Sequence, residues 1–227
     1  SRNMGPEDNF LHKVRELASE KNIVLIFDES TSGFRQSFGG LHKVYGVDPD
    51  MAVFGKALGN GYAITTVIGR REIMEAAQST FISSTFWTER IGPAAALKTL
   101  DIMERTKSWE TLTKIGLSVQ KKWAEIAREN NLKIQISGIP ALSTFALIAE
   151  DWLKYKTFMT QEMLKKNFLA SNALFVSVKH DDKVLNRYYD LLNEIFSQIK
   201  KFEKKIGSSV DEKLESKVCH SGFQRLN

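Results

Sequence analysis

The residues of this chain best suited to chemistry are Asp28 and Lys56. Asp28 ends an apolar run that starts at Asn22, and Lys56 follows a second run that starts at Met51, with glycine-rich turns around both. The two runs predict strands, so an acid and an amine would stand at two strand exits. Pyridoxal phosphate (PLP) requires this combination, because a lysine binds its aldehyde as a Schiff base and an acid faces its pyridinium nitrogen.

Four segments surround these two residues in a fixed order. They are residues 25–35 (LIFDESTSGFR), Gly39 with Gly40, residues 45–50 (YGVDPD) and residues 54–61 (FGKALGNG). In content, order and spacing they resemble the class III aminotransferases of PLP fold type I, particularly the branch of glutamate-1-semialdehyde 2,1-aminomutase. The resemblance implies that Asp28 is the partner of the ring nitrogen and that Lys56 is the Schiff-base lysine. Taken singly, such an aspartate is more often a cap and such a lysine a solvated amine, but four segments in register favour the functional interpretation.

Two positions that follow Asp28 depart from the pattern of these relatives. The relatives usually carry valine, which packs on the cofactor ring, where this chain has Ser30. They often carry glutamine or methionine where this chain has Thr31. The resemblance implies that Ser30 and Thr31 bind the cofactor, and that the contacts to the ring face and the ring hydroxyl differ here.

In these relatives a threonine ahead of a helix binds the cofactor phosphate of the neighbouring subunit. Within residues 83–93 (SSTFWTERIGP), counting back from Pro93 selects Thr88, whereas matching the Thr-Phe pair selects Thr85. We expect Thr88 to have this role, with Thr85 as the alternative, and the resemblance then implies a homodimer. Either threonine could instead simply cap the helix whose first turn holds Pro93.

The composition indicates a cytoplasmic globular protein of one or two domains in its 227 residues. Its single Cys219 cannot form an internal disulfide, no metal-ligand spacing occurs, and no apolar run reaches the length of a membrane span. The net charge of +5 comes from lysines that alternate with acids on predicted helices, which argues against a nucleic-acid partner. We expect the four histidines to be ordinary surface or capping residues; they are His12, His42, His180 and His220.

Helical and strand patterns alternate along the chain, which predicts an α/β fold. We expect helices over residues 6–21, 71–78, 93–106, 109–130, 151–166 and 182–206, and strands over residues 22–28, 51–54, 63–68, 133–139 and 141–148. By the resemblance, residues 1–108 are the C-terminal portion of the PLP-binding large domain, with a mostly parallel sheet. Residues 109–227 are then the small C-terminal α/β domain.

The resemblance implies a PLP-dependent aminotransferase or aminomutase, and therefore a transferase or an isomerase. Its substrate would be a small amine or carbonyl compound, such as an amino acid, a semialdehyde or an amino sugar. Family members carry a long segment before the position of Ser1, including the loop that holds the cofactor phosphate, so we expect the N-terminal half of the enzyme to be missing here. The alternative is a catalytically incomplete fragment or structural subunit without this phosphate cup. Near the C-terminus, we expect Arg225 to form an ion pair rather than to bind a substrate carboxylate.

Overall fold

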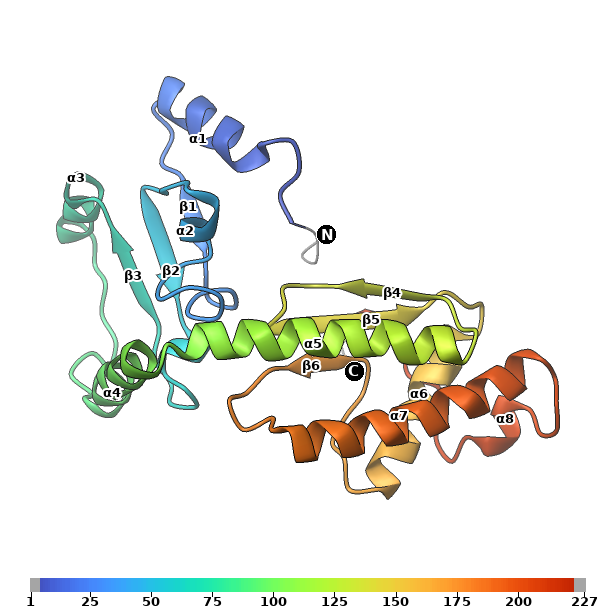
Figure 1. The fold of residues 1–227 in the computed structure, drawn as a ribbon. Helices are drawn as coiled ribbons and strands as arrows, with labels where there is room; N and C mark the ends of the chain where they lie inside the picture. The colour runs from blue at the N-terminus through green and yellow to red at the C-terminus, as the bar shows by residue number, and fades with distance from the viewer. Residues whose placement is uncertain (1–4, 223–227) are drawn as a thin grey trace. The chain divides into compact units, whose positions relative to one another are not determined.

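The computed structural model describes residues 5–222 (Figure 1). Residues 5–113 form one compact unit and residues 114–222 form another. The chain passes from the first to the second within the long helix α5 (Ser108–Glu129), which begins at the predicted domain boundary. The predicted ion pair of Arg225 lies outside the described residues.

A three-stranded sheet organises residues 5–113 (Figure 1). Its strands are β1 (Ile26–Asp28), β2 (Met51–Phe54) and β3 (Thr66–Gly69), in the spatial order β1-β2-β3. β1 pairs with β2 in parallel and β3 pairs with β2 in antiparallel orientation, so the sheet of this unit is mixed. The helices of the unit are α1 (Phe10–Glu20), α2 (His42–Tyr45), α3 (Arg71–Met74) and α4 (Ile91–Thr106), with short 3₁₀ segments at Lys56–Leu58 and Glu75–Ser79.

The apolar core of this unit is small. It consists of Ala52, Phe54, Leu58 and Ala96, with partly buried Phe34, Ile64 and Leu100 packed against it. The run that leads into β1 is apolar, but Ile26 is 53% exposed and Ile23 and Val24 are exposed too. Among the described residues β1 has a paired neighbour only on the β2 side, so it forms an edge of the sheet.

A second three-stranded sheet organises residues 114–222 and is antiparallel throughout. Its strands are β4 (Ile134–Ser137), β5 (Leu142–Leu147) and β6 (Ala173–Phe175), and the helices that follow α5 are α6 (Trp152–Lys165), α7 (Asp182–Glu203) and α8 (Val210–Lys213). Alternate residues of the central strand β5 are buried, which is the period of two that a half-covered strand requires. The Phe145 ring on β5 meets Trp123 edge-on at 4.8 Å and Phe196 at 5.8 Å between centroids, so β5, α5 and α7 share one core.

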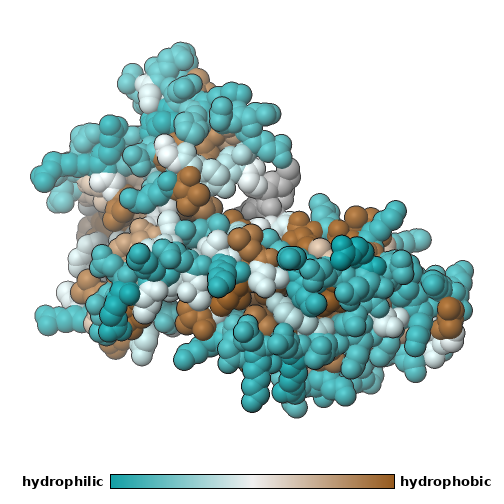
Figure 2. All heavy atoms as spheres, viewed as in Figure 1, coloured by the Kyte–Doolittle hydropathy of each residue, from teal (hydrophilic) through white to brown (hydrophobic). Residues whose placement is uncertain are grey.

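The long helices bury one face and expose charge on the other. On α7, the residues Leu192, Ile195, Phe196 and Ile199 are buried at a spacing of three and four residues. Lysines pair with acids on the exposed faces, as Lys200 does with Glu203 at 2.8 Å. Figure 2 shows hydrophilic residues over most of the face that it presents. The predicted alternation of lysines and acids on solvated helices is therefore confirmed. Among residues 5–222, every helix is too short or too polar to cross a bilayer.

Several element boundaries differ from the expectation. Helix α1 begins at Phe10 rather than at Pro6, because Asp8 and Asn9 adopt left-handed backbone angles of 50° and 57° in φ. The 22–28 strand is shortened to β1, and the 63–68 strand begins only at Thr66. The short elements α2, α8 and β6 were not predicted.

Candidate functional site

Asp28 and Lys56 lie at the same edge of the first sheet. Asp28 is the last residue of β1, and Lys56 comes two residues after the end of β2. The strands are parallel and in a register that sets Asp28 opposite Val53, so their carboxyl ends meet at one edge. In open α/β sheets, ligands bind in the crevice outside the carboxyl ends of the strands. The prediction of an acid and an amine at two strand exits is confirmed.

Lys56 begins the 3₁₀ segment that follows β2 and has a left-handed φ of 45°. A lysine rarely adopts this conformation, which is found where the surrounding structure or a function requires it. Its side chain is exposed, and its Nζ donates a hydrogen bond to Thr31 Oγ1. Because Thr31 is only three residues from Asp28, this bond brings the amine to the turn that follows the acid.

The carboxylate of Asp28 organises that turn. Its Oδ1 accepts a hydrogen bond from the Ser30 backbone N–H at 3.0 Å, which is the local contact that aspartate makes with the residue two positions on. Farther along the turn, Arg35 Nε donates to the Thr31 carbonyl at 2.7 Å. Ser30 and Thr31, the two departures from the family pattern, therefore contact Asp28 and Lys56 respectively.

The two candidate phosphate threonines lie in an exposed segment before α4. Neither caps the helix: the Glu89 carboxylate accepts from the backbone N–H of Ile91 and, at 3.0 Å, from that of Gly92. Within residues 5–222 the hydroxyls of Thr85 and Thr88 form no hydrogen bond to any residue, and nothing joins either one to the Asp28–Lys56 edge. The capping interpretation of these threonines is thus wrong.

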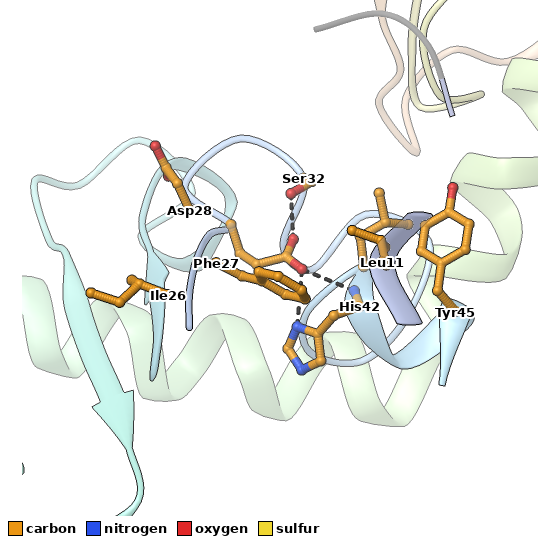
Figure 3. A pocket seen from close by; sticks show the side chains of 9 residues that line it. Leu11, Ile26, Phe27, Asp28, Ser32, His42 and Tyr45 are labelled. Carbon is orange, nitrogen blue, oxygen red and sulfur yellow. Dashed lines mark hydrogen bonds and ion pairs between the residues drawn. The ribbon is translucent and has the colours of Figure 1, made fainter. Parts of the chain in front are cut away.

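A buried polar cluster behind Asp28 was not predicted. Glu29 is 4% exposed and His42 is 8% exposed, and the His42 ring contacts Glu29, so the expectation that His42 is a surface or capping histidine was wrong. His42 Nδ1 lies 3.0 Å from Glu29 Oε1, and both residues line a shallow pocket of about 220 Å³ that also includes Asp28 and Tyr45 (Figure 3). Sequence offers one signal for Glu29, because the residue after Asp28 must point to the opposite face of the strand. Nothing in the sequence pairs it with His42.

A second buried carboxylate, Asp50, ties β1 to its surroundings. It accepts hydrogen bonds from the Leu25 backbone N–H at 2.8 Å, from Arg15 at 2.8 Å and from Arg70 at 2.9 Å. The bond from Leu25, together with the two guanidinium groups, lowers the pKa of Asp50 below its ordinary 3.8, against the opposing effect of burial. This carboxylate therefore stabilises the start of the strand that ends in Asp28.

Clusters of three or more His, Cys, Asp or Glu side chains suited to a metal ion do not occur within residues 5–222. The polar groups that the structure gathers at the sheet edge are instead an amine, a carboxylate and hydroxyls. That set suits an organic ligand with an aldehyde and a basic ring nitrogen.

Known proteins match most of this chain. The 3-aminobutyryl-CoA aminotransferase of Cloacimonas acidaminovorans is 32% identical over 202 residues, which is 86% of this chain and 49% of that protein. The glutamate-1-semialdehyde 2,1-aminomutase of Methanocaldococcus jannaschii is 28% identical, over 84% of this chain and 49% of its own length. The chain thus spans about half the length of the curated relatives it matches.

Solved structures show the same fold. The FumI protein of Sphingopyxis sp. MTA144, in its PLP internal aldimine form, has a TM-score of 0.82 at 22% identity, covering 90% of this chain and 50% of that one. An omega-transaminase from Sphaerobacter thermophilus has a TM-score of 0.78 at 21% identity, covering 88% and 50%. The fold is therefore that of PLP-dependent transaminases, fold type I. The model of the family described as aminotransferase class-III matches residues 3–203, and the chain belongs to the class III aminotransferase family.

Proposed function

We propose that this chain supplies the lysine and the ring-nitrogen acid of a PLP-dependent enzyme that transfers an amino group. The observation that carries this proposal is the parallel pairing of β1 and β2, which brings Asp28 and Lys56 to one carboxyl edge. The donor set fits PLP, because Lys56 offers a primary amine for the aldehyde and Asp28 a carboxylate for the ring nitrogen. The hydroxyls of Ser30 and Thr31 are available for the polar groups of the ring.

Each of these residues has a distinct task in the proposed reaction. PLP, when bound, supplies an electrophilic aldehyde and a ring that accepts electrons from the substrate carbon. Lys56 would hold the aldehyde through its Nζ, and the same amine, when free, would take a proton from the substrate carbon and return it. Asp28 would accept a hydrogen bond from the ring nitrogen and so favour its protonated form. Thr31 orients the Lys56 amine through the hydrogen bond already present.

The complete site needs residues beyond those of this chain. The exposed apolar side chains at β1, including Ile26, suggest that the preceding part of the enzyme pairs with this edge and supplies the phosphate loop. Phe86 and Trp87 are exposed beside Thr85 and Thr88, and such an apolar patch suits a second copy of the chain. In a homodimer, one of these threonines would reach the phosphate of the partner. We propose that the assembled enzyme is cytoplasmic.

The substrate class follows from the family and from the two departures near Asp28. The relatives include an aminotransferase and an aminomutase, so the reaction is either exchange of an amino group between two molecules or its shift within one. We propose a small amine or carbonyl substrate of the amino-acid, semialdehyde or amino-sugar type. A structural subunit without catalysis is the alternative, and it predicts that Lys56 is dispensable.

Variants of Lys56 and of Lys43, the lysine nearest to it in the sequence, test the proposal in the complete protein. Lys56→Ala should abolish both the visible absorbance of bound PLP that borohydride bleaches and the transfer of an amino group from an amine donor. Lys43→Ala is the matched control, because Lys43 is an exposed lysine on α2, and it should leave both signals intact. Retention of either signal in Lys56→Ala would contradict the assignment of the lysine.

A further inference from the structure

We propose that Glu29 and His42 form a positioning pair that fixes the Asp28 carboxylate and the turn that carries Thr31. The role rests on the proposed function, because it acts on the residues assigned there to PLP. Glu29 follows Asp28 directly and is almost fully buried, although a carboxylate is rarely buried unless its charge is satisfied. What satisfies it here is the loop that follows β1.

The Glu29 side chain accepts hydrogen bonds from three donors. Its Oε1 accepts from the His42 backbone N–H at 2.9 Å and from the His42 ring at Nδ1, 3.0 Å away, and its Oε2 accepts from Ser32 Oγ. Figure 3 shows dashed lines from Ser32 and His42 converging on this carboxylate. The carboxylate therefore joins the turn after β1 to the first residue of α2, across thirteen positions of sequence.

The main chain of Glu29 is fixed as firmly as its side chain. Its N–H donates to the Val53 carbonyl of β2 at 2.8 Å, and its carbonyl accepts from the Gly33 N–H at 2.8 Å. Because successive side chains of a strand point to opposite faces, holding Glu29 on one face holds Asp28 on the other. In Figure 3 the Asp28 side chain points away from Ser32 and His42.

The surroundings of His42 are shaped to accommodate the pair. Its ring packs against Phe27 of β1, with 5.9 Å between the centroids. A Cβ at Gly40 would lie 2.2 Å from two atoms of the His42 ring, closer than atoms can approach, and a tight 3.0 Å from Glu29 Oε1. A glycine at position 40 is therefore a steric requirement of the contact between the His42 ring and Glu29.

Loss of the positioning pair should lower the rate by displacing the Asp28 carboxylate. Glu29 and His42 are positioning residues, since they would act on the reaction only through Asp28, whose side chain points away from His42 (Figure 3). A catalytic group displaced by about 1 Å can lose about 10²-fold in rate, even when the mutated residue does not touch the substrate. The expected signature is thus a lower kcat with a KM changed by less than about twofold.

A double-mutant cycle in the complete enzyme tests this coupling. Glu29→Ala alone should lower kcat by about 10²-fold. In an Asp28→Asn background the same change should lower kcat by less than about threefold, because the Asp28 carboxylate that Glu29 positions is already lost. Glu29→Gln should restore most of the rate, since its amide oxygen still accepts from the His42 N–H. Tyr45→Phe, in the same pocket, is the matched control and should keep the wild-type kcat. An equal loss in both backgrounds would overturn the proposal.

Hydrogen exchange on the cofactor-free complete protein gives a readout that does not depend on catalysis. The amides of Ser30 and Gly33 should exchange faster in Glu29→Ala and in His42→Ala but not in Tyr45→Phe. Unchanged exchange in both Glu29→Ala and His42→Ala would overturn the proposal. If Glu29→Ala does not fold, His42→Ala completes both measurements, because it removes the ring contacts with Glu29 and Phe27 and keeps the hydrogen bond from the backbone N–H of residue 42 to Glu29. A wild-type protein without amino-transfer activity would refute the proposed function, while the exchange rates would still decide whether Glu29 holds the turn.

Discussion

Replacing Asp50 with alanine should loosen the start of β1 while leaving Asp28 and Lys56 in place. The Asp50 side chain is 5% exposed, and the hydrogen bond from the Leu25 N–H should contribute about 1 kcal/mol. The charged bond from Arg15, which is 22% exposed, should contribute about 1.5 to 2 kcal/mol. Arg70 is 61% exposed, so solvent screening reduces its share to about 0.5 kcal/mol or less. The free energy for local opening of β1 should fall by about 3 kcal/mol.

Native-state hydrogen exchange measures this opening at the Leu25 amide, which is itself a donor to Asp50. A loss of about 3 kcal/mol should accelerate its exchange by about 10²-fold. Asp48→Ala is the matched control, because Asp48 is an exposed aspartate two residues away in the same loop, and it should have no effect. Equal exchange at Leu25 in wild type and Asp50→Ala would refute the assignment of Asp50 as the anchor of β1.

The effect of Asp50 should also depend on pH in one direction. Its pKa is lower in the folded protein than the ordinary 3.8, so the folded state favours the ionised form. The contribution of Asp50 to the stability of β1 is therefore present above about pH 4, and it is lost as the pH falls through the lowered pKa of Asp50. The difference in the exchange rate of the Leu25 amide between wild type and Asp50→Ala should be constant from about pH 7 to 5 and should shrink in stronger acid. A difference that grew in acid would contradict the lowered pKa of Asp50.

Three further outcomes are expected of the proposed enzyme. Asp28→Asn should retain PLP but slow turnover by about 10²-fold, because the amide cannot hold a charged ring; a near wild-type kcat would remove Asp28 from the mechanism. Thr88→Val should weaken PLP retention by about tenfold through the loss of one hydrogen bond to a charged group, and the same loss in Thr85→Val instead would transfer the phosphate role to Thr85. Residues 1–227 alone should retain PLP more weakly than about 1 μM, since a phosphate needs several oriented backbone donors; tighter retention in equilibrium dialysis would show that the phosphate site lies within this chain.

The sequence predicted the long elements and the sheet edge because both depend on local patterns. The apolar residues of α7 recur with a period of about 3.6 and β2 is a short uninterrupted apolar run, and both elements form at nearly the predicted positions. The places of Asp28 and Lys56 at strand exits followed from the two apolar runs, whereas the parallel pairing of the strands was implied by the family resemblance. Such patterns need no knowledge of distant contacts.

Features that depend on distant or unusual contacts were missed. The burial of His42 accompanies its contact with Glu29, thirteen residues earlier in the chain, and the left-handed angle of Lys56 is a backbone conformation that no hydrophobic pattern encodes. The exposure of Ile26 could not be predicted either, because a hydrophobic run reports what a strand can bury and not what covers it. The start of α1 depended on two left-handed residues, Asp8 and Asn9, that no hydrophobic pattern encodes.

The central claim is that Lys56 is the lysine that carries the cofactor. Peptide mapping by mass spectrometry, after borohydride reduction of the complete protein loaded with PLP, tests it most directly. We expect the added cofactor mass on the peptide that contains Lys56, and we expect fragmentation to assign it to this residue. Cofactor mass on Lys43, or on any lysine other than Lys56, would show that Lys56 is not the lysine that carries the cofactor.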